Sequence, residues 1–376
     1  MKVGIVAGEP SGDFLGAQLI ADLRAQRPGL KVAGIGGPAL RAAGCEVLYP
    51  MEKLAVMGLV EVLGKLWALS RLRARLADYF SNDPPDVFIG VDAPDFNLGL
   101  ERKLREKGVK TVHYVCPTAW AWRPWRTYGI KRAAQRLLSL FPFEEAFFRS
   151  RGVNVHYVGH PLARQVALAA DAAGARQRLG LAADVLTVAL LPGSRAAELN
   201  RLVRPFIDAA AWLAARHEQI CFISNAVNAE AAQQLRAAAA RRGIQLLVVR
   251  DRSADTLAAA DVALVASGTV TLEAMLHKTP LVVAYRMHSL SYWLLRAMIR
   301  VKFVALPNLL AQTRLAPEYF QADCRAEVLG PALQYWLEHP QQTQALMRRF
   351  TELHYALRNA DASAAQVVLD LIDGNL

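Results

Sequence analysis

The chain has 376 residues, of which 53% are hydrophobic, so it is long enough for two domains with separate cores. It contains no long polar or low-complexity tract, which argues against a disordered protein. The net charge of +11 favours anionic partners, a class that includes nucleotides, nucleic acids, phosphorylated substrates and anionic membranes.

Cysteine usage and apolar runs restrict the class further. The cysteines Cys45, Cys116, Cys221 and Cys324 lie far apart and form no CxxC pair. This argues against a structural zinc site and a disulfide framework, and it is typical of a reducing cytoplasm. The N-terminal apolar run stops at Glu9, too early for a signal peptide, and no run approaches the roughly 20 residues that span a bilayer. We expect a soluble or peripheral protein.

The first half predicts a parallel α/β sheet, because apolar strand patterns alternate with helical ones. Strands are expected at 2–7, 31–37, 45–49, 86–91, 110–116, 136–144 and 153–161. The first strand leads into Gly8-Glu9-Pro10-Ser11-Gly12-Asp13 and a helical pattern over 15–23. A glycine-rich turn that opens a helix can hold a phosphate or a sugar through backbone N–H groups. A tight strand-to-helix turn explains the segment equally well, since it is neither GxGxxG nor a P-loop.

Residues 57–80 predict an amphipathic helix with basic residues beside its apolar face. A broad apolar face with a tryptophan and flanking arginines suits a helix that lies in a membrane interface. A core helix with a solvated basic side is the alternative, and the sequence leaves both open. The residues expected at the membrane are Val60, Leu63, Leu66, Trp67, Leu69 and Arg71.

The segment from Ile89 to Asn97 follows a buried strand and contains two carboxylates, a proline and an amide. Ligands of open α/β sheets bind outside the carboxyl ends of the strands, so a strand that ends at Asp92 would place this carboxylate where chemistry occurs. Capping of the next helix by Asp92, with Pro94 in the first turn, is the alternative.

Residues 117–126 form another candidate segment, because three tryptophans and two arginines, Trp122 among them, fall within seven residues. Such a segment suits stacking on a sugar face, contact with acyl chains or binding of membrane headgroups. Stacking on single-stranded nucleic acid is a further option.

The second half predicts its own sheet, with strands at 186–191, 220–224, 244–249, 262–266 and 281–285. The first strand ends in Gly193, Ser194 and Arg195, a turn suited to a phosphate at a helix start. The fourth ends in Ser267-Gly268-Thr269, whose amides and hydroxyls can hold a diphosphate. Glu273 can accept from ribose hydroxyls, and an ordinary first-turn helix acid is the alternative.

The C-terminal third carries weaker signals. Residues 286–302 repeat the aromatic and basic pattern of the helix predicted over residues 57–80. Asn308 follows a proline and is either a turn residue or a ligand contact. Residues 341–371 predict an amphipathic helical tail.

Two α/β halves with a phosphate-binding turn in the second resemble the GT-B glycosyltransferases. Six blocks, in order and across the whole chain, resemble the lipid-A-disaccharide synthase family. They are Ala7–Asp13, Leu54–Gly58, Asp92–Asn97, Trp120–Arg123, Leu191–Arg195 and Leu306–Leu310. The first turn departs from the family at Pro10, where a threonine is common.

The resemblance implies two Rossmann-like parallel-sheet domains that face each other across a cleft. Residues 1–165 would bind the acceptor and contact the membrane, and residues 166–345 would bind the UDP-sugar. Residues 346–376 would form a helical segment that packs back on the first domain.

The resemblance also implies an inverting, metal-independent reaction without a cofactor. A 2,3-diacylglucosamine unit would pass from UDP-2,3-diacylglucosamine to 2,3-diacylglucosamine 1-phosphate (lipid X), giving the β-1,6 disaccharide 1-phosphate of lipid A and UDP. The enzyme would be cytoplasmic and peripheral at the inner face of the cytoplasmic membrane of a Gram-negative bacterium. Homodimers that exchange C-terminal segments are known in the family, and no nucleic acid is expected as a partner.

Residue roles follow from the matching blocks. Asp92 matches the base that takes the proton from the acceptor 6-hydroxyl, and Arg195 matches the cation that offsets charge on the leaving diphosphate. The UDP-sugar site would comprise Gly193, Ser194, Arg195, Ser267, Gly268, Thr269, Glu273 and Asn308. The acceptor site would include Glu9, Ser11, Asn97 and Trp122.

Two other functions are compatible with the sequence. Another GT-B UDP-sugar transferase or an epimerase would need a different acceptor or catalytic group, and it leaves the Asp92–Asn97 block unexplained. A non-catalytic protein that binds anionic membranes or RNA through the basic and aromatic patches would give no role to Asp92.

Overall fold

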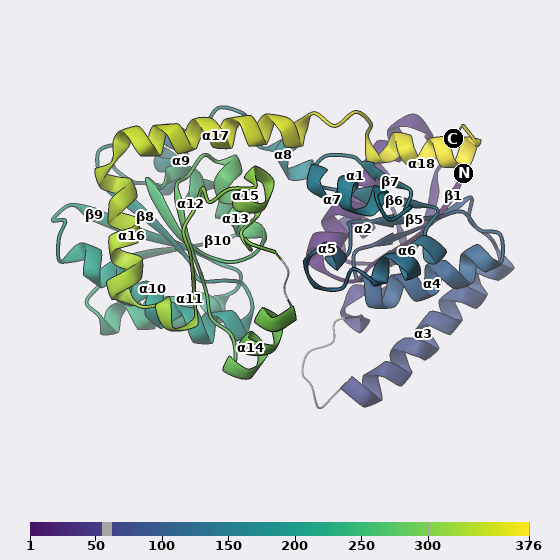
Figure 1. The fold of residues 1–376 in the computed structure, drawn as a ribbon, viewed down its shortest axis with the longest axis horizontal. Helices are drawn as coiled ribbons and strands as arrows, with labels where there is room; N and C mark the ends of the chain where they lie inside the picture. Colours follow the sequence, from purple (N-terminus) through teal and green to yellow (C-terminus); the bar gives the residue numbers. More distant parts are fainter. Residues whose placement is uncertain (55–61, 299–300, 376) are drawn as a thin grey trace. The chain divides into compact units, whose positions relative to one another are not determined.

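The computed structural model describes residues 1–54, 62–298 and 301–375, and the chain divides into two compact units (Figure 1). Unit 1 comprises Met1–Pro161 and Leu357–Leu376, and unit 2 comprises Leu162–Ala356. The boundaries expected from the sequence lie at 165/166 and 345/346. Unit 2 therefore keeps residues 346–356, which had been assigned to the returning segment.

Unit 1 is built on a seven-stranded parallel sheet in the order β3-β2-β1-β4-β5-β6-β7. The strands are β1 (Lys2–Ala7), β2 (Lys31–Gly36), β3 (Glu46–Pro50), β4 (Val87–Val91), β5 (Thr111–Tyr114), β6 (Arg136–Ser139) and β7 (Val155–Tyr157). Every residue of β4 is buried, as expected for a strand covered on both faces. This explains why its sequence is a continuous apolar run.

Helices cover both faces of this sheet (Figure 1). They are α1 (Pro10–Gln26), α2 (Pro38–Ala42), α3 (Val62–Asn82), α4 (Pro94–Glu106), α5 (Ala119–Trp122), α6 (Arg126–Ala133), α7 (Pro142–Arg149) and α18 (Ala364–Asp373), with a 3-10 turn at Met51–Lys53 and with α8 (Pro161–Gln165) at the boundary. The last helix, α18, lies against α1, and its Val367 and Val368 are buried in the same core as β1 and β4. The C-terminal helix is thus part of the core of unit 1.

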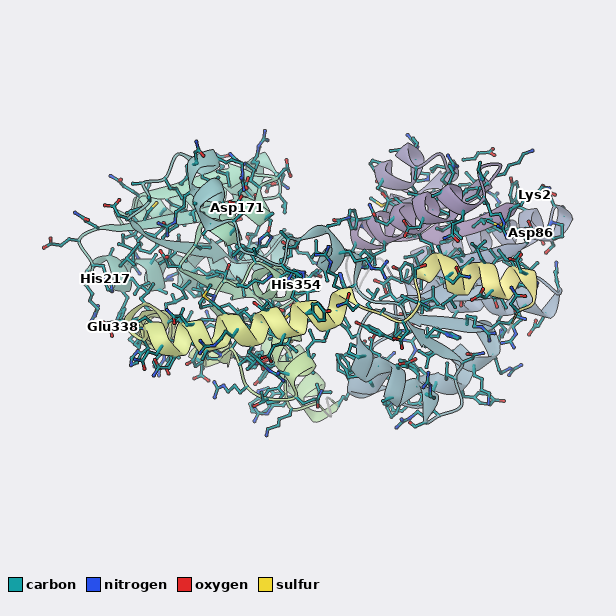
Figure 2. The ribbon with its side chains drawn as sticks, turned by 90° about the horizontal axis from the view of Figure 1, so that it is seen from above. Lys2, Asp86, Asp171, His217, Glu338 and His354 are labelled. Atoms are coloured by element: carbon teal, nitrogen blue, oxygen red, sulfur yellow. The ribbon has the colours of Figure 1, made fainter. Side chains whose placement is uncertain are left out.

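Polar contacts tie the ends of unit 1 together. The backbone N–H of Lys2, labelled in Figure 2, donates to the Asp86 carboxylate at 2.7 Å. Lys110 Nζ donates to the carbonyl of Ile372 at 2.7 Å, and Arg27 pairs with Asp373 at 3.0 Å. The first strand and the last helix are therefore both anchored to the sheet.

Unit 2 is built on a six-stranded parallel sheet in the order β10-β9-β8-β11-β12-β13. The strands are β8 (Leu186–Leu191), β9 (Ile220–Ala226), β10 (Leu246–Arg250), β11 (Val262–Ala266), β12 (Leu281–Tyr285) and β13 (Glu318–Phe320). The helices are α9 (Ala172–Leu179), α10 (Ala196–Ala214), α11 (Ala229–Arg241), α12 (Ser253–Ala259), α13 (Thr269–Leu276), α14 (Ser289–Met298), α15 (Leu306–Ala311), α16 (Ala326–Glu338) and α17 (Pro340–Arg358), with a 3-10 turn at Gln321–Asp323.

A buried polar contact fixes α17 within unit 2. His354, labelled in Figure 2, is fully buried, and its Nδ1 lies 2.5 Å from Nζ of Lys278. Its Nε2 bonds with the carbonyl of Ala163 at 2.8 Å. Burial lowers the pKa of Lys278 to about 8. The start of unit 2, the end of α13 and the long helix α17 are therefore joined at one buried point.

The parallel α/β architecture predicted for both halves is confirmed, with three local corrections. The predicted strand 136–144 ends at Ser139, and α7 begins at Pro142, because proline is favoured at the first helical position and Glu144 bonds back to the N–H of Phe141. The predicted tail over 341–371 is two helices, separated at residues 359–363. The edge strand β13 was not predicted.

The described part of the chain contains no helix with the length and apolar composition to cross a membrane.

Candidate active site

The carboxyl ends of β1 and β4 lie side by side at the centre of the unit 1 sheet, because Ala7 pairs with Val91. The turns that follow these two strands are therefore neighbours. A Cβ added to Gly8 would lie 3.1 Å from the Cβ of Ala93, so a side chain at this position would be tightly packed against the second turn. The two segments predicted to carry chemistry in this half meet at one edge.

Asp92 leaves β4 in a left-handed conformation, with φ of 51° at Asp92 and 43° at Ala93. Its N–H donates to the carbonyl of Tyr114 on β5 at 2.8 Å. Ala93, not Asp92, is the N-cap residue of α4, and no side chain caps this helix end. Helix capping, the alternative explanation for Asp92, is therefore wrong. The structure shows no hydrogen bond of the Asp92 carboxylate with the described residues.

Unusual backbone conformations gather at this edge of the sheet. Val115, which follows β5, has φ of 80°, a rare value for a β-branched residue. Together with Asp92 and Ala93 it gives three left-handed residues other than glycine at the ends of two adjacent strands. Such conformations cost free energy and are concentrated at functional sites.

Asn97 lies beneath the turn and is fully buried. Its side-chain nitrogen donates to the carbonyls of Asp92 at 2.8 Å, Val6 at 3.2 Å and Val91 at 3.3 Å. The residue thus joins the ends of β1 and β4 and holds the Asp92 backbone. Asp95 points the other way, is exposed and forms an ion pair with Arg126 at 2.5 Å. Of the predicted acceptor residues, Asn97 therefore supports the turn from inside.

The turn after β1 places Glu9 at the N-cap position of α1 and Ser11 in the first turn, both exposed. Asp13, which follows, is buried and accepts hydrogen bonds from the N–H groups of Gly37 at 2.7 Å and Ala39 at 2.9 Å. Asp13 therefore caps α2 and fixes the turn, whereas Glu9 and Ser11 lie at its surface.

The tryptophan-rich segment forms α5 and the loop after it. Trp122 is partly buried, its ring nitrogen donates to the Thr118 hydroxyl at 3.3 Å, and the Arg123 guanidinium lies 3.7 Å from its ring centroid. Trp120 donates to the buried carboxylate of Glu144 at 3.2 Å. Burial raises the pKa of Glu144 to about 8, although this hydrogen bond opposes the shift.

The residues that were expected at the membrane lie only in part within the described structure. Val60 lies outside the described residues, and Leu63 and Leu66 lie in α3 with side chains that the structure does not describe. Trp67 is 66% exposed and stacks with the Arg71 guanidinium at 3.8 Å, whereas Leu69 packs partly against the core. The helix therefore presents a solvent-exposed aromatic and cationic pair.

In unit 2, the carboxyl ends of β8 and β11 are adjacent, since Leu191 pairs with Val265. The turn with Gly193, Ser194 and Arg195 leads into α10. Glu198 accepts from the N–H of Ser194 at 3.1 Å and of Arg195 at 3.3 Å, and it pairs with the Arg195 guanidinium at 3.2 Å. Two amides of the turn that was predicted to bind phosphate therefore already donate to a carboxylate of this protein, that of Glu198. The Arg195 side chain is nevertheless 65% exposed.

The second turn of this edge follows β11. Ser267 is partly buried, and Gly268 and Thr269 are exposed at the start of α13. Glu273 lies one turn further and accepts from the Ser253 hydroxyl at 2.8 Å. Burial raises the pKa of Glu273, although this hydrogen bond opposes the shift. The turn offers exposed donor groups next to a carboxylate held by α12.

Asn308 differs from these residues because it is fully buried and its amide is fully used. Its nitrogen donates to the carbonyl of Ala316 at 2.8 Å and to Glu318 at 2.9 Å, and its oxygen accepts from the N–H groups of Leu315 and Ala316. Asn308 thus organises the loop that leads to β13.

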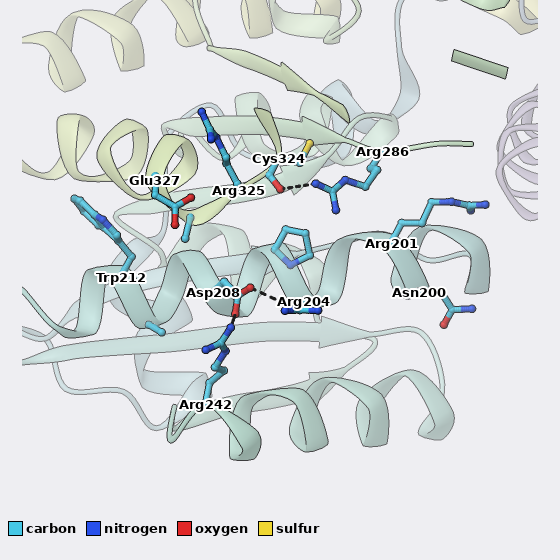
Figure 3. A pocket seen from close by; sticks show the side chains of 13 residues that line it. Asn200, Arg201, Arg204, Asp208, Trp212, Arg242, Arg286, Cys324, Arg325 and Glu327 are labelled. Carbon is cyan, nitrogen blue, oxygen red and sulfur yellow. Dashed lines mark hydrogen bonds and ion pairs between the residues drawn. The ribbon is translucent and has the colours of Figure 1, made fainter. Parts of the chain in front are cut away.

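A positively charged hollow of about 670 Å³ lies along α10 and α16 (Figure 3). Its lining includes five arginines, Arg201, Arg204, Arg242, Arg286 and Arg325, against the two carboxylates of Asp208 and Glu327. Asp208 pairs with Arg242 at 2.6 Å and with Arg204 at 3.7 Å. This group cannot be recognised in the sequence, because its members are spread over 128 positions, from Asn200 to Glu327.

The described residues contain no group of three or more His, Cys, Asp or Glu side chains that could hold a metal ion.

Comparison with known proteins gives a consistent result over the whole chain. A family model described as lipid-A-disaccharide synthetase matches residues 3–369. A lipid-A-disaccharide synthase of Pseudomonas fluorescens is 46% identical over 373 residues, which cover 99% of each chain. One of Aliivibrio salmonicida is 43% identical over 376 residues, which cover 99% of this chain and 98% of the relative.

Solved structures share the fold at low identity. The UDP-GlcNAc 2-epimerase of Neisseria meningitidis, bound to UDP-GlcNAc, has a TM-score of 0.66 at 12% identity over all of both chains. WaaG, a glycosyltransferase involved in lipopolysaccharide biosynthesis, has a TM-score of 0.58 at 15% identity, again over all of both chains. MurG of Acinetobacter baumannii gives 0.53 at 16% identity over 99% of each. The fold is therefore GT-B.

Proposed function

Because the chain belongs to the lipid-A-disaccharide synthase family, a family of glycosyltransferases in lipid A biosynthesis, we propose that it joins two acylated glucosamines. It transfers 2,3-diacylglucosamine from UDP-2,3-diacylglucosamine to the 6-hydroxyl of 2,3-diacylglucosamine 1-phosphate. The products are the β-1,6 disaccharide 1-phosphate and UDP. The configuration at the donor C1 inverts, because the acceptor oxygen attacks from the face opposite the leaving diphosphate.

Asp92 is the catalytic base of this proposal. The observation that carries it is the position of this carboxylate, on a left-handed turn at the end of the central strand β4 and without a hydrogen bond among the described residues. A base must come within hydrogen-bond distance of the hydroxyl whose proton it takes, and a base contributes about 10²–10⁴-fold. As the acceptor oxygen forms its bond with C1, its proton passes to Asp92.

Arg195 offsets the charge of the leaving diphosphate. Its guanidinium is 65% exposed at the start of α10, where the helix dipole also favours an anion. The Glu198 carboxylate bonds with the Arg195 side chain and with two amides of the turn. A diphosphate with more charge than Glu198 competes for the same arginine, and this replaces the need for a metal ion.

The remaining residues take binding or supporting roles. Ser267, Gly268 and Thr269 donate hydrogen bonds to the diphosphate of the UDP-sugar. Glu273 accepts hydrogen bonds from the ribose hydroxyls. Glu9, Ser11 and Trp122 contact the acceptor from the surface of unit 1. Asn97 and Asn308 are fully buried, so they act by holding the turns around the two substrates.

The enzyme works as a peripheral protein at the inner face of the cytoplasmic membrane, where both acylated substrates reside. Trp67 and Arg71 support this, because an exposed tryptophan beside an arginine suits the headgroup region. We also propose that the chain forms homodimers that exchange their C-terminal segments. Sedimentation analysis of the purified chain measures its oligomeric state and tests this.

One assay tests the proposed reaction. The protein is incubated with UDP-2,3-diacylglucosamine and 2,3-diacylglucosamine 1-phosphate, with EDTA in a parallel sample, and UDP and disaccharide are quantified. We expect equal amounts of both products, a β linkage by NMR and the same rate with EDTA. UDP-GlcNAc without acyl chains serves as the control donor, and its epimerisation in place of transfer would contradict the proposal.

A further inference from the structure

Glu101 and His113 form a buried polar pair that the proposed reaction does not use. Glu101 lies on α4 and His113 on β5, and both are fully buried. Nδ1 of His113 lies 2.6 Å from Oε1 of Glu101. A Cβ at Gly90 would lie only 2.0 Å from this same oxygen, so the carboxyl group packs directly on the backbone of β4. The glycine at position 90 of β4 therefore leaves the space that the Glu101 carboxyl group occupies.

Asn97 shares the same space. It precedes Glu101 by four residues on α4, so the two side chains lie on one face of the helix. The space above Gly90 is also bounded by Asn97, whose Cβ and Cγ would lie 2.8 and 3.0 Å from a Cβ at that position. The two side chains are therefore neighbours beneath the Asp92 turn.

The hydrogen bonds of Asn97 fix the orientation of its amide. Its nitrogen faces the carbonyls of Val6, Val91 and Asp92, which only a donor can satisfy. Its oxygen must then face the opposite way, and it has no partner among the described residues. Oε2 of Glu101 is a second buried oxygen there without a partner. Two neighbouring buried acceptors without a donor carry a large free-energy cost.

A single proton removes this conflict. We propose that Glu101 is held as a neutral carboxylic acid whose Oε2–H donates to Oδ1 of Asn97, which makes Glu101 a positioning residue for Asp92. Oε1 then accepts from the Nδ1–H of His113. An ionised Glu101 would satisfy Oε1 alone and leave both other oxygens without a donor. Burial also raises the pKa of Glu101, although His113 opposes the shift.

The inference rests on the proposed role of Asp92, and it explains how a strained turn keeps one geometry. Glu101 orients Asn97, and Asn97 holds the carbonyl of Asp92. Displacement of a reacting group by about 1 Å can cost about 10²-fold in rate, so loss of this support lowers kcat more than substrate binding.

Infrared spectroscopy and paired variants of the full chain test the proposal. Glu101→Gln keeps the shape and supplies an N–H donor to Asn97, whereas Glu101→Met keeps the size and removes the donor. At about pH 6, above the ordinary pKa of a glutamate, the wild type should show the carbonyl stretch of a protonated carboxylic acid that Glu101→Gln lacks. Glu144→Gln is the matched control, because it removes a different buried acid.

The kinetic arm separates positioning from packing. We expect Glu101→Gln to retain at least half of the wild-type kcat, and Glu101→Met to lose about 10²-fold in kcat with KM for the donor within about twofold. Loss of activity in Glu101→Gln, or full kcat in a less stable Glu101→Met, would overturn the positioning role. Absence of the Glu101 band would overturn the neutral acid whatever the activity. Absence of transferase activity in the wild type would instead refute the proposed function.

Discussion

The side-chain nitrogen of Asn97 donates a hydrogen bond of 2.8 Å to the main-chain carbonyl of Asp92. Asp92 has φ of 51°, so the bond supports a backbone conformation that L residues rarely adopt. The same nitrogen reaches the carbonyls of Val6 and Val91. A single buried amide therefore connects the two central strands of unit 1 to the proposed base.

Replacement of Asn97 by alanine should destabilise unit 1. The buried carbonyls at the ends of β1 and β4 lose a shared donor, and a buried group left unpaired costs about 1–3 kcal/mol. We expect a fall of at least that amount in the free energy of unfolding, measured by urea denaturation. Asn200→Ala is the control, because Asn200 is exposed on α10. Equal unfolding midpoints for Asn97→Ala and the wild type would contradict the role given to this amide.

Loss of the Arg195 guanidinium should impair departure of UDP. Removal of one group that stabilises developing charge typically costs about 10²–10³ in kcat, and we expect Arg195→Ala to fall in that range. Steady-state kinetics with the acylated donor measures the effect. Arg204→Ala is matched, since Arg204 lies on α10, the helix that Arg195 precedes, is 86% exposed and pairs with Asp208. If both variants lose the same small factor, Arg195 has no special part in the reaction.

Glu144 should make stability depend on pH. Its pKa is raised to about 8 in the folded state, so between about pH 4.5 and 8 the folded protein binds more protons than the unfolded chain. This contribution to stability is present at low pH and is lost as pH rises through 8, at up to about 1.4 kcal/mol per pH unit.

Thermal unfolding of Glu144→Gln tests this pH dependence. The glutamine cannot ionise, so the variant should gain in Tm relative to the wild type as pH rises from about 5 to 8. Glu106→Gln, at an exposed position on α4, gives the reference for a carboxyl-to-amide change. A Tm difference that stays constant over this range would show that Glu144 ionises normally in the folded protein.

The membrane proposal predicts that Trp67, Leu69 and Arg71 contribute to vesicle binding. Their combined replacement by serine removes an exposed aromatic group, part of an apolar face and a cation. We expect weaker sedimentation with vesicles that contain anionic lipid, and little change with neutral vesicles. Tyr355→Ser removes an aromatic side chain that is 61% exposed on α17 and serves as the control. Undiminished binding of the triple variant would contradict this surface as the contact.

The fold could be predicted largely because buried parallel strands are continuous apolar runs. The runs at 2–7, 186–191, 262–266 and 281–285 coincide with β1, β8, β11 and β12. Strand β13 escaped prediction because it has only three residues of mixed polarity. The start of α7 was mistaken for a strand because aromatic residues flank Pro142, and only the bond from Glu144 to the Phe141 N–H reveals a helix start.

Sequence reasoning could single out candidate site residues only where a polar side chain follows an apolar strand. Asp92 and Arg195 became candidates in this way, and their roles remain proposals. Glu101 and His113 lie on a predicted helix and a predicted strand, twelve residues apart, and no sequence signal connects them, so their pairing depends on the packing of α4 on β4 and β5. Glu198 was missed for a similar reason, because an acid in a first helical turn is ordinary until its partners are known.

Turnover by Asp92→Asn, measured beside Asp95→Asn, tests the central claim most directly. The two aspartates are three residues apart, but Asp92 directly follows β4 whereas Asp95 is exposed and paired with Arg126. We predict that Asp92→Asn lowers kcat for disaccharide formation by about 10²–10⁴-fold and still binds UDP, whereas Asp95→Asn keeps kcat within about threefold of the wild type. Full turnover by Asp92→Asn would contradict the assignment of this carboxylate as the base.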